Sequence, residues 1–218
     1  MTKANIRILI ADDHPVFRKG LRQVIEAESD LLVIGEATDG DAALAFVRQE
    51  KPDVAVVDVH MPGSGGFDFL RAIKKEKLAV AVIFLTMFND ETMFNTAMDL
   101  GAKGYVLKES AASDITASIR SVAAGRPYIS PQLSGFLLNR SQHAAQLVEQ
   151  HPGLNSLTPT ERRILKLIAD YQSSKEIAAE LHIHYRTVDN HRSNICQKLN
   201  LHGSNALLKF AVENRSKI

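Results

Sequence analysis

The sequence predicts an α/β domain with a doubly wound, five-stranded parallel sheet, followed by a small all-helical domain. Residues 1–125 alternate short runs rich in Val and Ile with amphipathic stretches, which is typical of repeated βα units. Residues 156–218 show only helical periodicity and contain sequences typical of helix starts. The length of 218 residues is sufficient for two domains of ordinary size.

Five short apolar runs in the first domain indicate buried parallel strands, because both faces of such strands are covered. The runs are Ile6–Ala11, Leu31–Glu36, Asp53–Val57, Val80–Leu85 and Gly104–Leu107. Amphipathic stretches near residues 15–28, 40–50, 66–76, 91–99 and 112–124 predict the helices. Right-handed crossovers between the strands then produce the doubly wound sheet.

Residues 126–155 interrupt this alternation. Pro, Gly and Ser gather at both ends, in RPYISP and QHPGLNS, which predicts a linker. Apolar residues between Leu133 and Val148 are spaced so that they fit one helix. We interpret this segment as a linker that carries a docking or dimerisation helix.

Two capping boxes organise the second domain, at residues 158–161 (TPTE) and 173–176 (SSKE). The first predicts a helix through Ile168, and the second a short helix that ends near Leu181. A third helix is expected from about Arg186 to Leu199, and a fourth from Gly203-Ser204 to about Val212. Two short helices joined by a tight turn, the second polar on one face, are typical of a helix-turn-helix.

Charge is distributed unevenly along the chain. Residues 1–125 hold 14 Lys and Arg against 18 Asp and Glu, whereas residues 126–218 hold 12 against 7. This asymmetry favours contact of the second domain with a polyanion. The single cysteine, Cys196, excludes an internal disulfide framework, and no apolar run is long enough for a membrane span. We therefore expect a cytoplasmic protein that does not cross a membrane.

Charged and hydroxylic side chains follow four of the predicted strands. Asp12-Asp13 follow the first, Asp58 the third, Thr86 the fourth and Lys108 the fifth. Parallel strands bring such residues to one edge of a sheet, where ligands bind. Clustered carboxylates need a cation, and oxygen ligands suit Mg²⁺. An aspartate can attack phosphorus, so the pattern predicts a site that carries a phosphoryl group on an aspartate.

The alternative for any one of these acids is a helix cap or a solvated loop residue. Their occurrence at successive strand ends argues against that alternative for the whole set. His14, beside the acids, is expected to begin the first helix and line the rim of the site, because histidine is a poor Mg²⁺ ligand.

Several motifs resemble a known family. The segments ADDHPVFRKGL, VVDVHMPGSGG, FLTMF and KGYVLKES resemble the receiver domain of bacterial two-component response regulators. The segments LTPTERRIL and SSKEIAAELHIHYRTVDNHRSNICQKL resemble the LuxR-type helix-turn-helix of the NarL/FixJ subfamily. Together the two resemblances cover nearly the whole chain outside the linker. They imply a receiver domain at 1–125, a linker at 126–155 and a DNA-binding domain at 156–218.

The receiver resemblance implies a role for each residue of the predicted site. Asp58 is the implied phosphoacceptor, and Thr86 and Lys108 contact the phosphoryl group. Thr86 and Tyr105 form the implied conformational switch, although Tyr105 alone could be a half-buried edge-strand tyrosine. The implied Mg²⁺ ligands are Asp12, Asp13, Asp58 and the main-chain carbonyl of His60.

The LuxR-type resemblance implies that the third helix of the second domain contacts double-stranded DNA. The expected contact residues are Thr187, Asp189, Asn190, His191, Arg192, Ser193 and Lys198. Asn190 can read adenine, and Asp189, where relatives often have lysine, can accept from cytosine N4. The alternative is an ordinary solvated polar face.

We therefore expect a phosphorylation-dependent transcription regulator that receives its phosphoryl group on Asp58 from a histidine kinase and binds DNA as a homodimer. It is not expected to be an enzyme beyond self-catalysed phosphorylation and dephosphorylation. One alternative is a Mg²⁺-dependent aspartyl-phosphate phosphohydrolase, although the Asp-x-Asp nucleophile motif of the haloacid dehalogenase type is absent. The other is a receiver-type interaction module that does not bind DNA.

Overall fold

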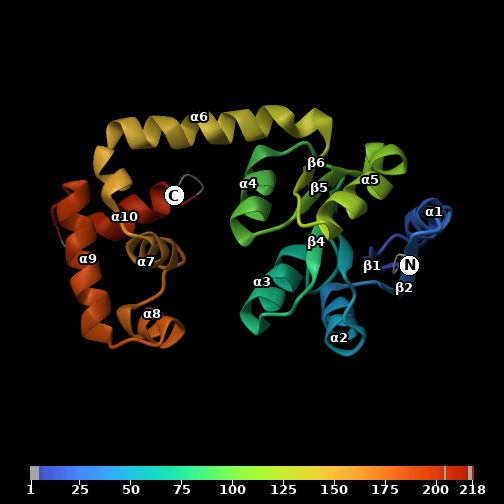
Figure 1. Ribbon diagram of the computed structural model, residues 1–218, viewed down its shortest axis with the longest axis horizontal. Helices are drawn as coiled ribbons and strands as arrows, with labels where there is room; N and C mark the ends of the chain where they lie inside the picture. Colours follow the sequence, from blue (N-terminus) through green and yellow to red (C-terminus); the bar gives the residue numbers. More distant parts are fainter. Residues whose placement is uncertain (1–4, 204, 216–217) are drawn as a thin grey trace. The chain divides into compact units, whose positions relative to one another are not determined.

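A six-stranded parallel sheet organises the N-terminal half of the chain (Figure 1). The computed structural model describes residues 5–203, 205–215 and 218. The strand order is β2-β1-β3-β4-β5-β6. The strands are β1 (Ile6–Ala11), β2 (Leu31–Ala37), β3 (Val54–Asp58), β4 (Ala81–Thr86), β5 (Gly104–Leu107) and β6 (Tyr128–Ile129). The chain divides into a first compact unit, Met1–Phe136, and a second, Leu137–Ile218.

Helices cover both faces of this sheet, as the sequence predicts (Figure 1). Helices α1 (Pro15–Glu26) and α5 (Ala111–Ala123) pack on one face. Helices α2 (Gly40–Glu50), α3 (Gly66–Glu76) and α4 (Glu91–Leu100) pack on the other. Because side chains alternate along a strand, Ile8 and Ile10 of β1 enter the first core and Leu9 the second. The predicted fold class is confirmed for this half of the chain.

The sixth strand, β6, is a difference from the predicted five-stranded sheet. It pairs with β5 and continues in a 3₁₀ turn, Pro131–Leu133, whose Leu133 is fully buried in the core of the first unit. Ser130 ties this segment down, because its N–H donates to the Tyr105 carbonyl at 3.0 Å and its Oγ donates to Asp114 Oδ2 at 2.8 Å. A two-residue strand carries no periodicity, so the sequence pattern did not indicate it.

Helices build the remainder of the chain. Helix α6 (Ser134–Gln150) and a 3₁₀ turn, Pro152–Ser156, lead into the helices α7 (Pro159–Ala169), α8 (Ser174–Leu181), α9 (Tyr185–Leu199) and α10 (Ala206–Glu213). Both capping boxes form, with reciprocal bonds between Thr158 and Glu161 and between Ser173 and Glu176. Ser204, expected at the start of the last helix, lies outside the described residues. No helix in the part of the chain that the structure describes is both long and apolar enough to cross a bilayer.

A partly buried ion pair joins the start of α7 to the last turn of α9. The Glu161 side chain is only 3 % exposed, and its Oε2 accepts from Lys198 Nζ at 2.7 Å and from the Thr158 N–H at 2.8 Å. Burial alone would raise the pKa of Glu161, but the bonds from Lys198 and Thr158 outweigh it and lower the pKa. Lys198 also donates to the Ser156 carbonyl at 3.0 Å, so this pair fixes α9 against the N-terminus of α7.

We predict that Glu161→Gln lowers the free energy of unfolding of the second unit at pH 7 by about 1–3 kcal/mol, because Lys198 loses its charged partner. A carboxylate whose folded pKa lies below its ordinary value of 4.5 stabilises the fold above that pH and loses its effect as the pH falls further. The difference from the wild type should therefore shrink below pH 4.5. Urea unfolding of the full chain followed by circular dichroism measures it. Glu213→Gln, at an exposed position of α10, is the control. A difference that does not change with pH would contradict the pairing.

Candidate functional site

Three carboxylates and one ammonium group meet at the carboxyl ends of β1, β3 and β5. Asp12 and Asp13 follow β1, Asp58 ends β3, and Lys108 follows β5. Lys108 Nζ lies 2.6 Å from Asp58 Oδ2 and 2.7 Å from Asp12 Oδ2. Asp12, Asp58 and Lys108 are all buried, so the lysine bridges two carboxylates that water barely reaches. The strand order places β1 beside β3, which explains why these distant acids are neighbours.

The environment changes the acidity of both charged partners. Burial raises the pKa of Asp58, and its bonds with Lys108 and with the His60 N–H counteract this only in part. Burial would lower the pKa of Lys108, but its bonds with Asp12 and Asp58 outweigh that effect and raise it. Lys108 therefore stays protonated, and its charge offsets the cost of two buried carboxylates.

The donor set at this edge suits a divalent cation. Ligand atoms of Asp12, Asp13, His14 and Asp58 all lie within 4.8 Å of one another. Ligands on opposite sides of a Mg²⁺ ion are about 4.2 Å apart, because each metal–oxygen bond is about 2.1 Å long. Asp13 Oδ1 is a buried oxygen, and His14 Nδ1 lies 2.8 Å from it. Both the spacing and this oxygen fit a cation held mainly by carboxylates.

Thr86 and Tyr105 lie on the neighbouring strands β4 and β5. Thr86, at the end of β4, is fully buried, and its Oγ1 accepts from the Phe88 N–H at 3.1 Å. The Tyr105 ring is also fully buried and makes edge contacts with Phe84 and Phe94. Burial raises the pKa of Tyr105 to about 12. Tyr105 is thus not the half-buried edge residue considered from the sequence, because β6 covers β5.

Two residues of α1 also shape this site and were missed in the sequence. Lys108 Nζ lies 4.7 Å from the centre of the Phe17 ring, which favours its positive charge. Arg18 Nη1 donates to the Asp12 main-chain carbonyl at 2.6 Å, while its Nε bonds Glu36 at 2.7 Å. Both residues fall in the first turn after the acidic pair, but their sequence spacing alone gives no sign of these contacts.

Helix α9 presents a polar face in the second unit. Its apolar residues Val188, Ile195 and Leu199 are buried in the core of that unit. The residues predicted to contact DNA divide by exposure: Thr187, Asp189, Asn190 and Ser193 are exposed, and His191 and Arg192 are half-buried. The exposed set lies on the side of α9 opposite its core face, as helical spacing requires.

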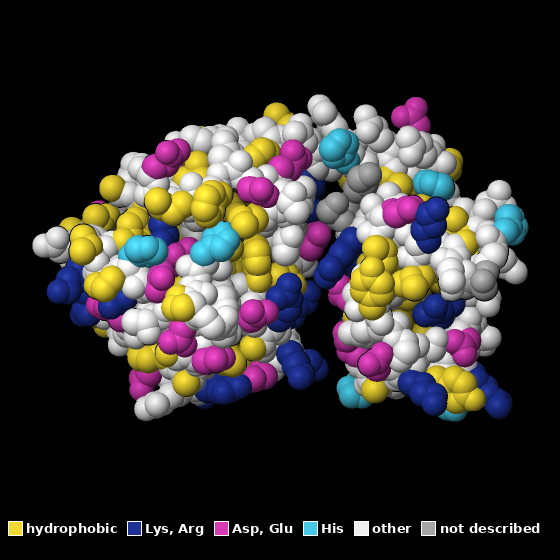
Figure 2. Space-filling view, turned by 180° about the vertical axis from the view of Figure 1, so that it is seen from behind, with side chains coloured by type: hydrophobic (Ala, Val, Ile, Leu, Met, Phe, Trp, Pro, Cys, Tyr) yellow, Lys and Arg dark blue, Asp and Glu magenta, His cyan; other side chains and the backbone are white. Residues whose placement is uncertain are grey.

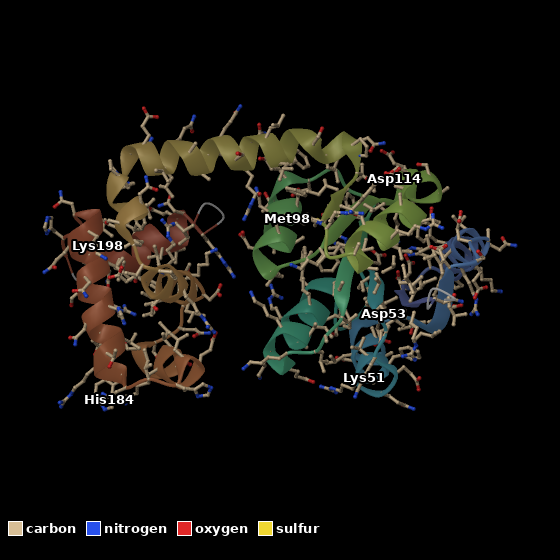
Figure 3. All side chains as sticks on the ribbon, in the orientation of Figure 1. Lys51, Asp53, Met98, Asp114, His184 and Lys198 are labelled. Carbon is tan, nitrogen blue, oxygen red and sulfur yellow. The ribbon has the colours of Figure 1, made fainter. Side chains whose placement is uncertain are left out.

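Lys198, which also belongs to this predicted set, is half-buried and paired within the second unit. Its ammonium is engaged by Glu161 and by the Ser156 carbonyl, so its charge is neutralised within the second unit. Figure 3 shows Lys198 and His184 at opposite ends of α9. The helical pattern placed Lys198 near the polar face, but it did not indicate that a buried carboxylate on α7 lies within reach.

The first turn of α9 carries aromatic and cationic groups that the predicted set omitted. The Tyr185 ring lies 4.6 Å from the His184 ring, and Arg186 Nε donates to the Tyr185 hydroxyl at 3.4 Å. His184 caps the helix, because its Nδ1 accepts from the Arg186 N–H at 3.2 Å. This arrangement orders Arg186 at the exposed end of α9.

Comparison with known proteins identifies both units. Residues 8–120 match the family model of the response regulator receiver domain, and residues 155–217 match that of bacterial regulatory proteins of the luxR family. The transcriptional regulatory protein LiaR of Bacillus subtilis is 37 % identical over 196 residues, which cover 90 % of this chain and 92 % of LiaR. A probable transcriptional regulatory protein NarL of Mycobacterium tuberculosis is 32 % identical, covering 96 % of this chain and 95 % of that protein.

Solved structures of response regulators also match the chain. The complex of the two-component response regulator RcsB with DNA matches with a TM-score of 0.58 and 27 % identity, covering 94 % of this chain and 97 % of that one. A LuxR-family response regulator from Aurantimonas sp. matches with a TM-score of 0.60 and 32 % identity, covering 63 % of this chain and 99 % of that one. The chain therefore belongs to the two-component response regulators that join a receiver domain to a LuxR-type helix-turn-helix, a family of phosphorylation-dependent DNA-binding transcription regulators.

Proposed function

We propose that Asp58 is the phosphoacceptor of this regulator and that its phosphorylation controls the binding of α9 to duplex DNA. The observation that carries the proposal is the buried bridge in which Lys108 Nζ lies 2.6 Å from Asp58 and 2.7 Å from Asp12. A nucleophilic carboxylate beside a positive charge is what phosphoryl transfer requires.

The chemistry uses groups that are already in position. An oxygen of Asp58 attacks phosphorus and forms the O–P bond, while the bond between phosphorus and the leaving group of the donor breaks. Lys108 Nζ then leaves Asp58 Oδ2 and contacts a phosphoryl oxygen. The ammonium thus stays beside the negative charge, which now lies on the phosphoryl group. The Thr86 hydroxyl, bonded to the Phe88 N–H, can turn to donate to a second phosphoryl oxygen. These movements would vacate space beside Tyr105, which gives the switch its two states.

Asp12, Asp13 and Asp58 would hold Mg²⁺, together with the main-chain carbonyl of His60. The ion would neutralise charge on the transferring phosphoryl group. The spacing of the carboxylates and the buried Asp13 Oδ1 support this assignment. Asp12 contributes through its charge as well, since its Oδ2 is bonded to Lys108.

On the DNA side, Asn190 and Asp189 would contact base edges, and Thr187, Ser193, His191 and Arg192 would lie nearer the backbone. Base contacts specify sequence, whereas phosphate contacts set register and salt dependence. The exposure of Asp189 and Asn190 on α9 supports their assignment to bases. We omit Lys198 from this set because Glu161 neutralises it.

The phosphodonor in this proposal is a histidine kinase, and the phosphorylated form binds DNA as a homodimer on two half-sites. The protein acts as a regulator in the cytoplasm, and any catalysis is limited to its own phosphorylation and dephosphorylation. Its single cysteine, Cys196, is a free thiol, which fits a reducing compartment.

We predict that Asp58→Asn takes up no phosphoryl group when the full chain is incubated with acetyl phosphate and Mg²⁺. The amide is a poor nucleophile, so the intact mass should stay unchanged, whereas the wild type gains one phosphoryl group. Asp53→Asn is the control: Asp53 precedes the same strand at its other end, where its Oδ2 accepts from the Arg7 N–H at 2.8 Å (Figure 3). An undiminished adduct on Asp58→Asn would refute the assignment.

Asp13→Ala should abolish Mg²⁺ binding, which we expect in the micromolar-to-millimolar range for the wild type, and should also abolish phosphorylation by acetyl phosphate. The reason is that Asp13 offers an accessible carboxylate that Lys108 does not occupy. Isothermal titration with MgCl₂ measures the affinity, and Asp41→Ala, at an exposed acid of α2, is the control. Unchanged titration of Asp13→Ala would place the cation elsewhere.

Asp189→Lys should tighten binding to random duplex DNA and steepen the salt dependence of log K by about one unit, because a repelling charge becomes one phosphate contact. Glu213→Lys makes the same charge change on α10 and serves as the control. Fluorescence anisotropy across several salt concentrations measures both. If the two variants behave alike, only net charge matters, and α9 does not face the duplex.

A further inference from the structure

The His14 imidazole lies against the acidic cluster at the mouth of the pocket. His14 Nδ1 is 2.8 Å from Asp13 Oδ1 and 3.5 Å from Asp12 Oδ1. The imidazole is 68 % exposed, so an ion from solution can reach it. Figure 2 shows histidine side chains at the surface, with Asp and Glu side chains nearby. Between residues 1 and 136 the sequence has two histidines, His14 and His60.

The short contact between His14 and Asp13 is a histidine–carboxylate contact. Asp13 Oδ1 is buried, and His14 Nδ1 lies 2.8 Å away. A metal ion that enters here would replace the proton between the two atoms, because metal ligands bind in their deprotonated form, and the nitrogen and the oxygen would then be ligands of one cation.

The distances agree with that arrangement. Neighbouring ligands of an octahedral ion with bonds of about 2.1 Å are separated by about 3.0 Å, and opposite ligands by about 4.2 Å. The 2.8 Å between His14 Nδ1 and Asp13 Oδ1 matches neighbouring ligands. The complete set, which also includes Asp12 and Asp58, lies within 4.8 Å. Nitrogen and carboxylate oxygen can therefore bind one ion from adjacent positions.

We propose that His14 Nδ1 is a nitrogen ligand that makes this cation site bind Zn²⁺ and Co²⁺ with His14 and the carboxylates together. Mg²⁺ prefers oxygen and binds the carboxylates alone, leaving the imidazole free. The inference rests on the cation site of the proposed function. It adds a selectivity for Zn²⁺ and Co²⁺ that carboxylates alone do not supply. Zn²⁺ then competes with Mg²⁺ for the pocket that holds Asp58.

The substitution His14→Ala isolates the imidazole from the rest of the site. The His14 main-chain N–H donates to Asp12 Oδ1 at 2.8 Å, and alanine retains that bond. His14 is the N-cap residue of α1, but its side chain makes no capping bond, so the start of the helix is preserved. His143→Ala is the control, because His143 is an exposed histidine of α6 and lies outside the cation site.

The test uses the full chain labelled with ¹⁵N-histidine. Two-bond ¹H–¹⁵N spectra recorded during addition of ZnCl₂ should show the Nδ1 resonance of His14 shift, identified by its absence in His14→Ala. MgCl₂ should leave that resonance in place. In isothermal titrations, His14→Ala should lose about tenfold or more in Zn²⁺ affinity while its Mg²⁺ affinity stays the same. His143→Ala should change neither affinity.

The possible outcomes separate this inference from the proposed function. If Zn²⁺ leaves the His14 resonance unmoved and binds His14→Ala as tightly as the wild type, the nitrogen ligand is refuted while Mg²⁺ binding stands. Loss of both Zn²⁺ and Mg²⁺ affinity in His14→Ala would refute the selectivity, because the imidazole would then support the site as a whole. Failure of Mg²⁺ to bind the wild type would instead refute the cation site of the proposed function.

Discussion

The rest of the receiver depends on one buried interaction, the ammonium of Lys108 held between the carboxylates of Asp12 and Asp58. The parallel order of β1 and β3 forces the two acids together, and unpaired buried carboxylates would be costly. Lys108 offsets that cost while it stays charged, because the pair of acids raises its pKa. The same arrangement makes the site sensitive to any new anion or cation, since each changes what the lysine pairs with.

The segment that carries Lys108 is tied to the start of the linker. The Leu107 N–H lies 3.4 Å from Ser130 Oγ, and that hydroxyl also donates to Asp114 on α5. Ser130 in turn bonds the carbonyl of Tyr105, whose ring is enclosed by Phe84 and Phe94. Close-packed interiors do not deform continuously. Residues 105–107, which precede Lys108, are bonded to Ser130 at the start of the linker. A change at Lys108 therefore acts on both segments.

Much of the fold and part of the site could be predicted from the sequence, and the difference has a physical basis. Strand cores, capping boxes and the residues at strand ends are local patterns, so Asp58 and Thr86 were identified correctly as neighbours at one sheet edge. The pairing of Lys198 with Glu161, the strand β6 and the packing of Phe17 on Lys108 depend on contacts between distant segments. No spacing rule encodes those contacts, so the sequence pattern did not indicate that Lys198 is paired with Glu161.

The charge on α9 bears on the proposed binding of DNA as a homodimer. The other cations of α9 are Arg186 and Arg192, whereas Lys198 is paired with Glu161 and Asp189 places a negative charge on the exposed face. Few neutralised phosphates release few counterions, so one copy of α9 gains little sequence-independent affinity. Joining two copies makes the second binding event intramolecular, and the affinity of the pair then far exceeds that of either copy. In the proposed function, the weak charge of α9 would keep a single copy off random DNA, so that the state of the receiver would set the occupancy of a paired site.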